Sequence, residues 1–373
     1  MKYCKTCVQP DTRPNSFFTK DGNCVACDYR INKFGNWKKR YEILKKICNK
    51  YKSNNDKHDC IIGVSGGKDS TRQALFVRDK LKMKPLLVSL THPPQTVSNL
   101  GANNLSNLIR LGFDVIVSGP SPNTWKKLMK KGFLKYSNYR KSTEYSLFSC
   151  VPQIAIKYKI PLIFWGENPG LQLGDMKSTK RQGWDGNNLR YLNTLGGADS
   201  KWIKKIKPKI KNIYPYIYPD SFEFKKNKIQ IVYLGWFWKD WSMVYNGLIG
   251  ASEGIKIRNT NPIYTGDVSK VQSLEENWVH LNQMIKYYKF GFGRATDYAN
   301  DLIRNKKISR EQGIKIVKKY DGVCSKKYIK SFCKFIEISE KNFWKVVNKS
   351  VNKKLFLIKK NKITPKFIVG QTS

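Results

Sequence analysis

The sequence predicts an α/β fold in which a doubly wound parallel sheet follows a small cysteine-rich unit and precedes a mainly helical region. Three observations predict it. Short apolar runs alternate with amphipathic stretches within residues 57–242, two Cys-x-x-Cys pairs lie within residues 1–35, and helical periodicity dominates residues 270–350. A chain of 373 residues is long enough to bury a full core and to form two or three domains.

The N-terminal unit, residues 1–35, is rich in Cys, Pro, Asp and Gly and has no sustained periodicity. Cys4 and Cys7 form one pair, Cys24 and Cys27 form the other, and sixteen residues separate the pairs. This spacing is typical of a site in which four thiolates surround one Zn²⁺ ion. A redox dithiol is the alternative, which the flanking Pro and Gly residues disfavour. We expect a closed structural zinc site that contributes to folding and not to catalysis.

A connecting helix and linker, residues 36–56, are expected next, because apolar residues recur at helical spacing from Trp37 to Lys52. The α/β domain of residues 57–242 follows. Its predicted strands are Cys60–Val64, Leu86–Leu90, Asp114–Val117, Leu162–Trp165 and Ile229–Leu234. Its predicted helices are Asp69–Leu81, Leu100–Leu111 and Leu147–Tyr158. Strands and helices that alternate in this way favour right-handed crossovers and a ligand crevice at the carboxyl ends of the strands.

The remaining segments carry weaker signals. Residues 168–212 are rich in Gly, Asn and Lys, which predicts a long loop that covers a site. The aromatic cluster Trp236–Trp241 is interpreted as core or lid packing. Residues 243–373 form the mainly helical C-terminal region, and its segment Lys353–Lys366 is expected to be a poorly ordered basic tail.

The charge of the chain is strongly positive: 70 Lys and Arg residues stand against 27 Asp and Glu residues, a formal net charge of +43. Such a field attracts nucleic acid, anionic membranes and phosphorylated ligands. However, the lysines are scattered, and no segment shows the basic stripe with interleaved aromatic residues that a nucleic-acid surface has. We favour the interpretation that Lys is abundant together with Asn and Ile, as in proteins from AT-rich genomes, and we do not expect a nucleic-acid partner.

The N-terminal residues contain no apolar signal region, and no stretch approaches the roughly 18 apolar residues that span a bilayer. Of the nine Cys residues, four belong to the metal-like pattern and five are dispersed, which is unlike a secreted disulfide framework. We therefore expect a cytoplasmic protein without a membrane span.

A second motif joins a predicted strand to a predicted helix through two glycines, in the sequence Ser65-Gly66-Gly67-Lys68-Asp69-Ser70. Such a turn aims backbone N–H groups and the positive end of the helix at one point, which suits an anion. The run is not a Walker P-loop, because that motif needs Gly where Lys68 stands. The glycines permit close approach of a phosphate, the two serines and the lysine donate hydrogen bonds, and Asp69 is suited to orient an Mg²⁺ ion.

This run closely resembles the SGGxDS signature of the ATP-pyrophosphatase (PP-loop) family. The resemblance implies a fold of adenine-nucleotide alpha-hydrolase type with a 3-2-1-4-5 sheet, and cleavage of ATP between its α and β phosphates. In this chemistry an oxygen of the substrate attacks the α-phosphorus, and the adenylyl group turns a poor leaving group into a good one. The protein contributes positioning and charge stabilisation.

Three further segments resemble the N-acetyl sugar amidotransferases, and the similarity extends over nearly the whole chain. They are Cys4–Pro14, Pro161–Pro169 and Lys289–Asp297. The resemblance implies an enzyme that uses ATP and Mg²⁺ to convert the acetamido group of a bacterial surface-sugar precursor to an acetamidino group, in pseudaminic, legionaminic or aminouronic acid pathways.

The same resemblance implies roles for individual residues. Lys68, Asp69 and Glu167 are the expected catalytic residues, and Ser65 to Ser70 together with Gly166 are expected to bind ATP. Ser89 and His92 would line the adenine side, with His92 as an alternative catalytic base. The expected substrate contacts are Asn168, Arg294 and Asp297. Arg294 and Asp297 lie three apart on a predicted helix, so a structural salt bridge between them is the alternative.

An ammonia source is required, and the sequence shows no glutaminase triad, since it has only His58, His92 and His280 and no Gly-flanked nucleophilic Cys. The family resemblance suggests a glutaminase and an ammonia-channel subunit similar to the two halves of imidazole-glycerol-phosphate synthase. Two alternatives remain open from the sequence. One is a PP-loop tRNA sulfur transferase, and the other is a zinc-stabilised nucleic-acid-binding protein without enzymatic activity.

Overall fold

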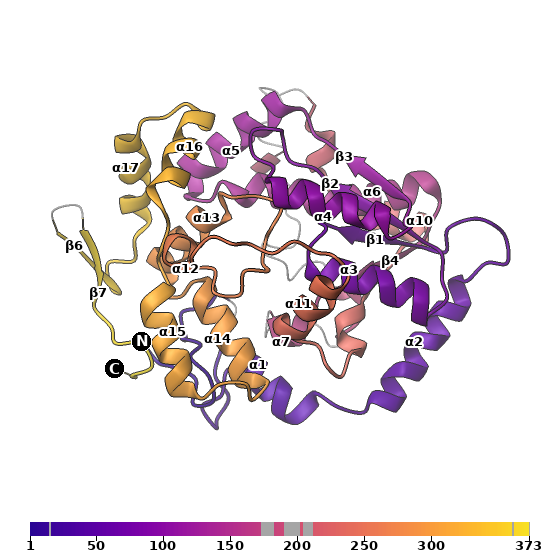
Figure 1. Cartoon of the computed structure of the whole chain (residues 1–373), viewed down its shortest axis with the longest axis horizontal. Helices are drawn as coiled ribbons and strands as arrows, with labels where there is room; N and C mark the ends of the chain where they lie inside the picture. Colours follow the sequence, from indigo (N-terminus) through magenta and orange to yellow (C-terminus); the bar gives the residue numbers. More distant parts are fainter. Residues whose placement is uncertain (15, 173–182, 190–201, 204–211, 360–361, 373) are drawn as a thin grey trace.

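A five-stranded parallel sheet in the order β3-β2-β1-β4-β5 forms the centre of the molecule (Figure 1). The computed structural model describes residues 1–372 except 15, 173–182, 190–201, 204–211 and 360–361. The strands are β1 (Cys60–Val64), β2 (Pro85–Leu90), β3 (Val115–Ser118), β4 (Leu162–Trp165) and β5 (Gln230–Tyr233). Each lies within two residues of its predicted bounds, and the strand order confirms the predicted doubly wound sheet of order 3-2-1-4-5.

Apolar residues cover both faces of this sheet because successive side chains of a strand point to opposite sides. One face presents Ile61, Val88 and Ile163 to α6, whereas the other presents Ile62 and Phe164 to α3. The helices of this part are α2 (Trp37–Tyr51), α3 (Lys68–Leu75), α4 (Asn99–Arg110), α5 (Pro122–Tyr136), α6 (Arg140–Tyr158) and α10 (Ser221–Lys226). The five residues Phe76–Lys80 continue α3 as a π-helical turn. The predicted helix Asp69–Leu81 is therefore an α-helix followed by this wider turn.

The C-terminal region is mainly helical, as predicted, and it packs beside the sheet domain. Its helices are α11 (Met243–Ser252), α12 (Pro262–Thr265), α13 (Val279–Phe290), α14 (Arg294–Arg304), α15 (Arg310–Tyr320), α16 (Lys326–Ile336) and α17 (Glu340–Ser350). Helix α11 packs along α3, and α16 and α17 pack on α5. The prediction of a disordered tail after residue 353 was wrong. Strands β6 (Phe356–Lys359) and β7 (Lys362–Pro365) form an antiparallel hairpin that Phe356 anchors, 1% exposed, in a cluster with Tyr287.

The cysteine-rich unit lies against α14 and α15, so the two ends of the chain meet (Figure 1). The backbone N–H of Val8 donates to Asn300 Oδ1 at 2.9 Å, and the N–H of Tyr3 donates to Thr372 Oγ1 at 3.2 Å. The unit contains one short helix, α1 (Val25–Asp28). This position brings residues of the N-terminal unit and of the C-terminal helices together near the carboxyl ends of the strands.

Much of the predicted loop 168–212 lies outside the described residues. Its described parts include α7 (Pro169–Gln172) and α8 (Gly186–Leu189). The aromatic cluster after β5 is core packing, as interpreted from the sequence: Phe237, Trp238 and Trp241 are at most 7% exposed. None of the helices in the described part of the chain combines the length and the apolar character that a membrane span requires.

Candidate functional site

The loop between β1 and α3 carries the Ser65–Ser70 motif at the carboxyl edge of the sheet. Gly66 has φ +75°, a conformation that disfavours any residue with a Cβ atom, and an added Cβ would lie 2.7 Å from the backbone of Asn104. Ser70 Oγ donates to the carbonyl of Gly67 at 3.0 Å and accepts from the N–H of Ser65 at 3.4 Å. The loop is therefore rigid, and the first N–H groups of α3 are directed to its concave side.

Lys68 and Asp69 begin α3 and form the charged centre of the site. Lys68 Nζ donates to Asp69 Oδ2 at 2.6 Å, and Asn246 of α11 donates to Asp69 Oδ1 at 2.6 Å. Asn246 is held in turn by Arg72 Nη1 at 2.5 Å, and Arg72 also pairs with Asp240. This chain of contacts fixes the carboxylate through α11, a helix that sequence reasoning did not assign to the site.

Two cavities meet at this centre. The inner cavity, about 170 Å³, lies at the carboxyl ends of β1, β2 and β4 and is closed by α6. Its walls are apolar at Val88, Leu90, Leu147, Val151 and Trp165, and polar at the loop and at the start of α6. The lining includes Gly63, Ser65, Gly67, Lys68, Asp69, Ser70, Val88, Leu90, His92, Arg140, Leu147, Cys150, Val151, Trp165, Gly166 and Glu167. An apolar slot next to a phosphate-type loop suits a planar base and its attached phosphates.

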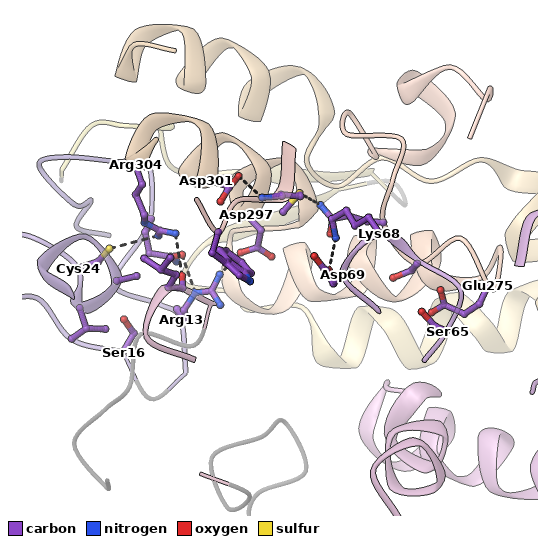
Figure 2. A pocket seen from close by; sticks show the side chains of 18 residues that line it. Arg13, Ser16, Cys24, Ser65, Lys68, Asp69, Glu275, Asp297, Asp301 and Arg304 are labelled. Atoms are coloured by element: carbon purple, nitrogen blue, oxygen red, sulfur yellow. Dashed lines mark hydrogen bonds and ion pairs between the residues drawn. The ribbon is translucent and has the colours of Figure 1, made fainter. Parts of the chain in front are cut away.

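The outer cavity, about 340 Å³, lies between the same loop, the cysteine-rich unit and the C-terminal region (Figure 2). Figure 2 shows Lys68 and Asp69 on one side, Arg13 and Cys24 on the other, and Asp297 between them in this view. Both cavities are lined by Ser65, Lys68, Asp69, Ser273 and Glu275. Ligands in the two cavities would therefore meet at the Lys68–Asp69 pair.

Glu167 follows β4 and lines the inner cavity. Its Oε2 atom is shielded from solvent and has no hydrogen-bond partner in the described part of the chain. Burial, with a contribution from the nearby Asp69, raises the pKa of Glu167 from 4.5 to about 7. The aromatic cluster fixes the backbone next to Glu167, because Trp241 Nε1 donates to the carbonyl of Gly166 at 3.1 Å. A carboxylate with this pKa can accept and release a proton near neutral pH.

His92 also lines the inner cavity, but a buried network constrains it. Its ring packs edge to face on Trp125, with 5.2 Å between ring centroids, and its Nδ1 lies 3.7 Å from the carboxylate of Glu276. Glu276 is fully buried and accepts from Tyr139 and from Arg140, each at 2.8 Å. Burial lowers the pKa of His92, although Glu276 opposes the effect, so the imidazole is neutral at pH 7. His92 is therefore a wall of the inner cavity held in a buried network, and its role as a catalytic base stays a prediction.

The four predicted metal ligands come together in the N-terminal unit, which confirms the spacing argument. The sulfur atoms of Cys4, Cys7, Cys24 and Cys27 all lie within 4.8 Å of one another, and all four residues are buried. The backbone N–H groups of Cys7 and Cys24 point at the sulfur of Cys4. Such N–H contacts stabilise thiolates and are typical of knuckle turns around a metal ion.

Besides Gly66, whose backbone shapes the loop, three residues predicted to contact nucleotide or substrate line neither cavity. Ser89 points to the sheet face of Leu87, because Val88 and Leu90 point to the inner cavity and strand side chains alternate. Asn168 is fully buried, where its Nδ2 donates to Gly235 and its Oδ1 accepts from the N–H of Leu171. The Asn168 side chain thus holds the backbone after β4, and neither Ser89 nor Asn168 lines a cavity.

The third such residue is Arg294, and it makes no salt bridge with Asp297. Its guanidinium donates to Ser273 Oγ at 3.1 Å and lies 4.0 Å from the buried Asp267. Arg294 therefore supports the segment that lines both cavities. Asp297 does line the outer cavity, where it pairs with Arg13 and, at 2.7 Å, with Lys286. The salt bridge that the sequence offered as an alternative does not form: Arg294 contacts Ser273 and Asp267, and Asp297 lines the outer cavity, where its contact to the substrate stays a prediction.

Sequence reasoning missed several lining residues because they come from distant segments. They are Arg13, Arg140, Gln272, Ser273, Glu275, Asp301 and Arg304. Arg304 lies 3.9 Å from the sulfur atoms of Cys7 and Cys24 and reaches the outer cavity. Only Arg13 had a signal, since it stands inside the Cys4–Pro14 segment that resembles the amidotransferases.

A comparison with known protein families found a match in the C-terminal part of the chain. Residues 264–367 are similar to the family model "LPS biosynthesis protein WbpG-like, C-terminal domain". The matched region supplies Gln272, Glu275, Asp297, Asp301 and Arg304 to the outer cavity. None of the curated proteins is a match for the chain.

Two solved structures are similar to the chain at low identity. An NH3-dependent NAD synthetase from Campylobacter jejuni, in complex with the nitrate ion, has 13% identity and a TM-score of 0.28, with 61% of this chain and 100% of that chain covered. The U34-tRNA thiolase NcsA from Methanococcus maripaludis, with its [4Fe-4S] cluster, has 10% identity and a TM-score of 0.31, with 82% and 88% covered.

Proposed function

We propose that this protein is an ATP-dependent amidotransferase that converts an acetamido group of a bacterial surface-sugar precursor to an acetamidino group. The observation that carries the proposal is the meeting of two cavities at Lys68 and Asp69, one suited to a nucleotide and one to a second small molecule. The WbpG-like match on residues 264–367 supports a role in lipopolysaccharide biosynthesis. We place the reaction in the cytoplasm, where ATP is available.

In this proposal the adenine of ATP lies in the apolar slot beside Val88, Leu147 and Trp165. The β and γ phosphates lie on the loop, where Gly67 leaves room and the start of α3 offers N–H groups. The α-phosphorus then faces the outer cavity, in which the acetamido group of the sugar approaches. Lys68 balances the negative charge that develops on the phosphates.

The reaction has two steps. The acetamido oxygen attacks the α-phosphorus, the bond from this phosphorus to the α,β-bridging oxygen breaks, and pyrophosphate leaves with the electron pair. Ammonia then adds to the carbon of the O-adenylyl imidate, one N–H proton is lost, and the C–O bond breaks to release AMP. The acetamido oxygen thus leaves on AMP, and nitrogen takes its place.

Glu167 is suited to take the proton that ammonia loses in the second step, because its carboxylate is available near neutral pH and lies by the loop. Asp69 is the residue that fits an Mg²⁺ ion, since its carboxylate lines both cavities and its two oxygens retain acceptor capacity beyond the bonds to Lys68 and Asn246. The ion would neutralise charge on the phosphates.

Zn²⁺ is the proposed metal of the cysteine cluster. A tetrahedral ion with Zn–S bonds of about 2.3 Å has sulfur–sulfur edges of about 3.8 Å. The sulfur atoms of Cys7 and Cys24 are 3.7 Å apart, and all four sulfurs lie within 4.8 Å. A single ion fits this spacing. The donor set is all sulfur, so the site is closed and its role is structural.

Ammonia must come from a partner in this proposal. In the described part of the chain no histidine is placed to activate a thiol: His280 is fully buried, His58 pairs with Asp114, and His92 contacts Glu276. Burial also raises the pKa of Cys150, the cysteine of the inner cavity, to about 12. We propose a glutaminase and an ammonia-channel subunit as partners, similar to the two halves of imidazole-glycerol-phosphate synthase.

The test is product analysis by mass spectrometry with ATP, ammonium and a panel of N-acetyl sugars. The proposal expects AMP and pyrophosphate in equal amounts and a sugar product lighter by about 1 Da, because NH replaces O in adenylate displacement. Formation of ADP, or no nucleotide cleavage with any acceptor, would refute it. A Cys150→Ser variant that binds ATP but loses all turnover would instead favour sulfur transfer.

A further inference from the structure

Arg13 places a rigid guanidinium in the outer cavity, on the side opposite the Ser65–Ser70 loop (Figure 2). Its Nε donates to Gln9 Oε1 at 2.8 Å, its Nη2 pairs with Asp297, and its plane lies 4.6 Å from the ring centroid of Phe292. The side chain is 20% exposed. Three contacts thus fix the orientation of the guanidinium before any ligand binds.

One edge of this guanidinium is free. Nη1 of Arg13 makes no hydrogen bond to any described residue, and it is not among the buried polar atoms that lack a partner, so it is exposed, in a side chain that lines the cavity. A guanidinium has five N–H donors, and the contacts to Gln9 and Asp297 occupy two of them. The unused edge offers a donor pair suited to a planar or phosphoryl anion.

The charges around Arg13 hold it in place. Asp297 pairs with both Arg13 and Lys286, and Asp321 acts on the same group. Burial alone would raise the pKa of Asp297, but Lys286 and Arg13 more than offset this effect and hold the pKa at about 2. The carboxylate is therefore ionised and keeps Arg13 oriented. Carboxylates and cations both line the cavity, so an anion would be recognised by the directed N–H groups of Arg13 and not by a net positive charge.

We propose that Arg13, held by Gln9, Asp297 and Phe292, binds an anionic group of the acceptor sugar and so selects acceptors that carry a carboxylate or a phosphate besides the acetamido group. This inference rests on the proposed function, because it assigns the outer cavity to the acceptor. The Lys68–Asp69 pair faces the reacting amide, and Arg13 marks the far end of the same acceptor. A cavity of about 340 Å³ suits one sugar unit with a single substituent of this kind.

The experiment measures equilibrium binding to the full chain by isothermal titration calorimetry with two matched pairs of probes. The first pair is 2-acetamido-2-deoxyglucuronic acid and its uncharged methyl ester, which tests a carboxylate. The second pair is UDP-N-acetylglucosamine and N-acetylglucosamine, which tests a diphosphate. We expect the wild-type chain to bind the charged member of at least one pair about 10- to 100-fold more tightly, the range of a charge-assisted hydrogen bond.

Arg13→Gln should abolish that preference and leave the affinity of the uncharged member within about twofold. Arg13→Lys, which keeps the charge but not the planar edge, should retain part of it. The matched control is Arg30→Gln, since Arg30 belongs to the same unit and bonds Asn305 at 3.0 Å but lines neither cavity. It should leave all four affinities unchanged.

The pair that responds identifies the source of the anion, a sugar carboxylate or a nucleotide diphosphate. Equal binding of both members in both pairs by the wild-type chain overturns the inference, and so does a charge preference that survives in Arg13→Gln. If Arg13→Gln does not fold, Arg13→Lys takes its place, and a charge preference that is undiminished in Arg13→Lys overturns the inference. The measurement needs no turnover, so a failure of AMP formation would refute the proposed function and leave this binding result as a separate outcome.

Discussion

Glu167 should control the pH dependence of the reaction, and Glu167→Gln isolates its role. Burial, and next the charge of Asp69, raises the pKa of Glu167 from 4.5 to about 7. As a base it acts only when deprotonated. At a constant concentration of free NH3, the rate of amidine formation in the wild-type enzyme should therefore rise about tenfold per pH unit below pH 7 and reach a plateau above it. Glu167→Gln should be about 10²- to 10⁴-fold slower, without this rise.

The same substitution makes a prediction about stability, with a definite sign. Because the pKa of Glu167 is higher in the folded than in the unfolded chain, ionisation disfavours the fold, and the free energy of unfolding should fall between about pH 4.5 and pH 7. The difference corresponds to at most about 3 kcal/mol, since each tenfold change in the ionisation constant is worth about 1.4 kcal/mol. Partial exposure of the side chain reduces this value.

Urea unfolding at pH 5 and pH 8 measures this effect, and AMP formation between pH 5.5 and pH 9 measures the rate. Glu167→Gln should be the more stable protein at pH 8 and close to wild type at pH 5. Glu340→Gln is the matched control, because Glu340 is exposed on α17 and lines neither cavity. A Glu167→Gln enzyme with the wild-type pH profile and rate would refute the role of Glu167 as the base.

Three further changes test the loop and the metal unit. Gly66→Ala should lower the free energy of unfolding by about 2–4 kcal/mol, because φ is +75° and the new Cβ would lie 2.7 Å from the backbone of Asn104. The control Gly35→Ala, where nothing lies within 4 Å of the new Cβ, should change the free energy of unfolding by less than about 0.5 kcal/mol. Equal losses of stability in the two variants would contradict the argument. Lys68→Met should lower kcat/KM for AMP formation about 10²- to 10³-fold, and unchanged kinetics would remove Lys68 from catalysis. Cys24→Ser should lose bound metal in elemental analysis and lower the melting temperature; full metal occupancy would contradict the four-thiolate site.

The parts of the fold that the sequence predicted are those governed by local rules. Buried parallel strands need continuous apolar runs, and all five runs became strands of one sheet. The cysteine spacing and the Gly-Gly turn are likewise local, and both formed as expected. Strand alternation also puts Ser89 on the opposite face of β2 from Val88 and Leu90, which line the inner cavity together with His92. The sequence analysis nevertheless assigned Ser89 to the nucleotide.

The outer cavity could not be predicted in this way, because its charges pair across the whole chain. Arg13 and Asp297 are 284 positions apart, and no periodicity relates them. The helical spacing of Arg294 and Asp297 suggested a pair, but tertiary contacts decided otherwise: the segment at Ser273 takes Arg294, and Arg13 and Lys286 take Asp297. Side chains on one helix face pair only when no better partner is packed against that face.

The metal unit consequently has a role beyond that of a staple. Cys24 and Leu171 both line the outer cavity. The guanidinium of Arg304 donates to the sulfur of Cys24 and to the carbonyl of Leu171, and so links the two. A guanidinium buried beside thiolates stays in place only while their negative charge persists, because an unpaired buried cation is costly. A bound metal would keep these thiolates deprotonated. Its loss would then release Arg304 and, with it, the wall that faces Arg13, so the proposed acceptor end of the site would depend on a cluster that takes no part in the proposed chemistry.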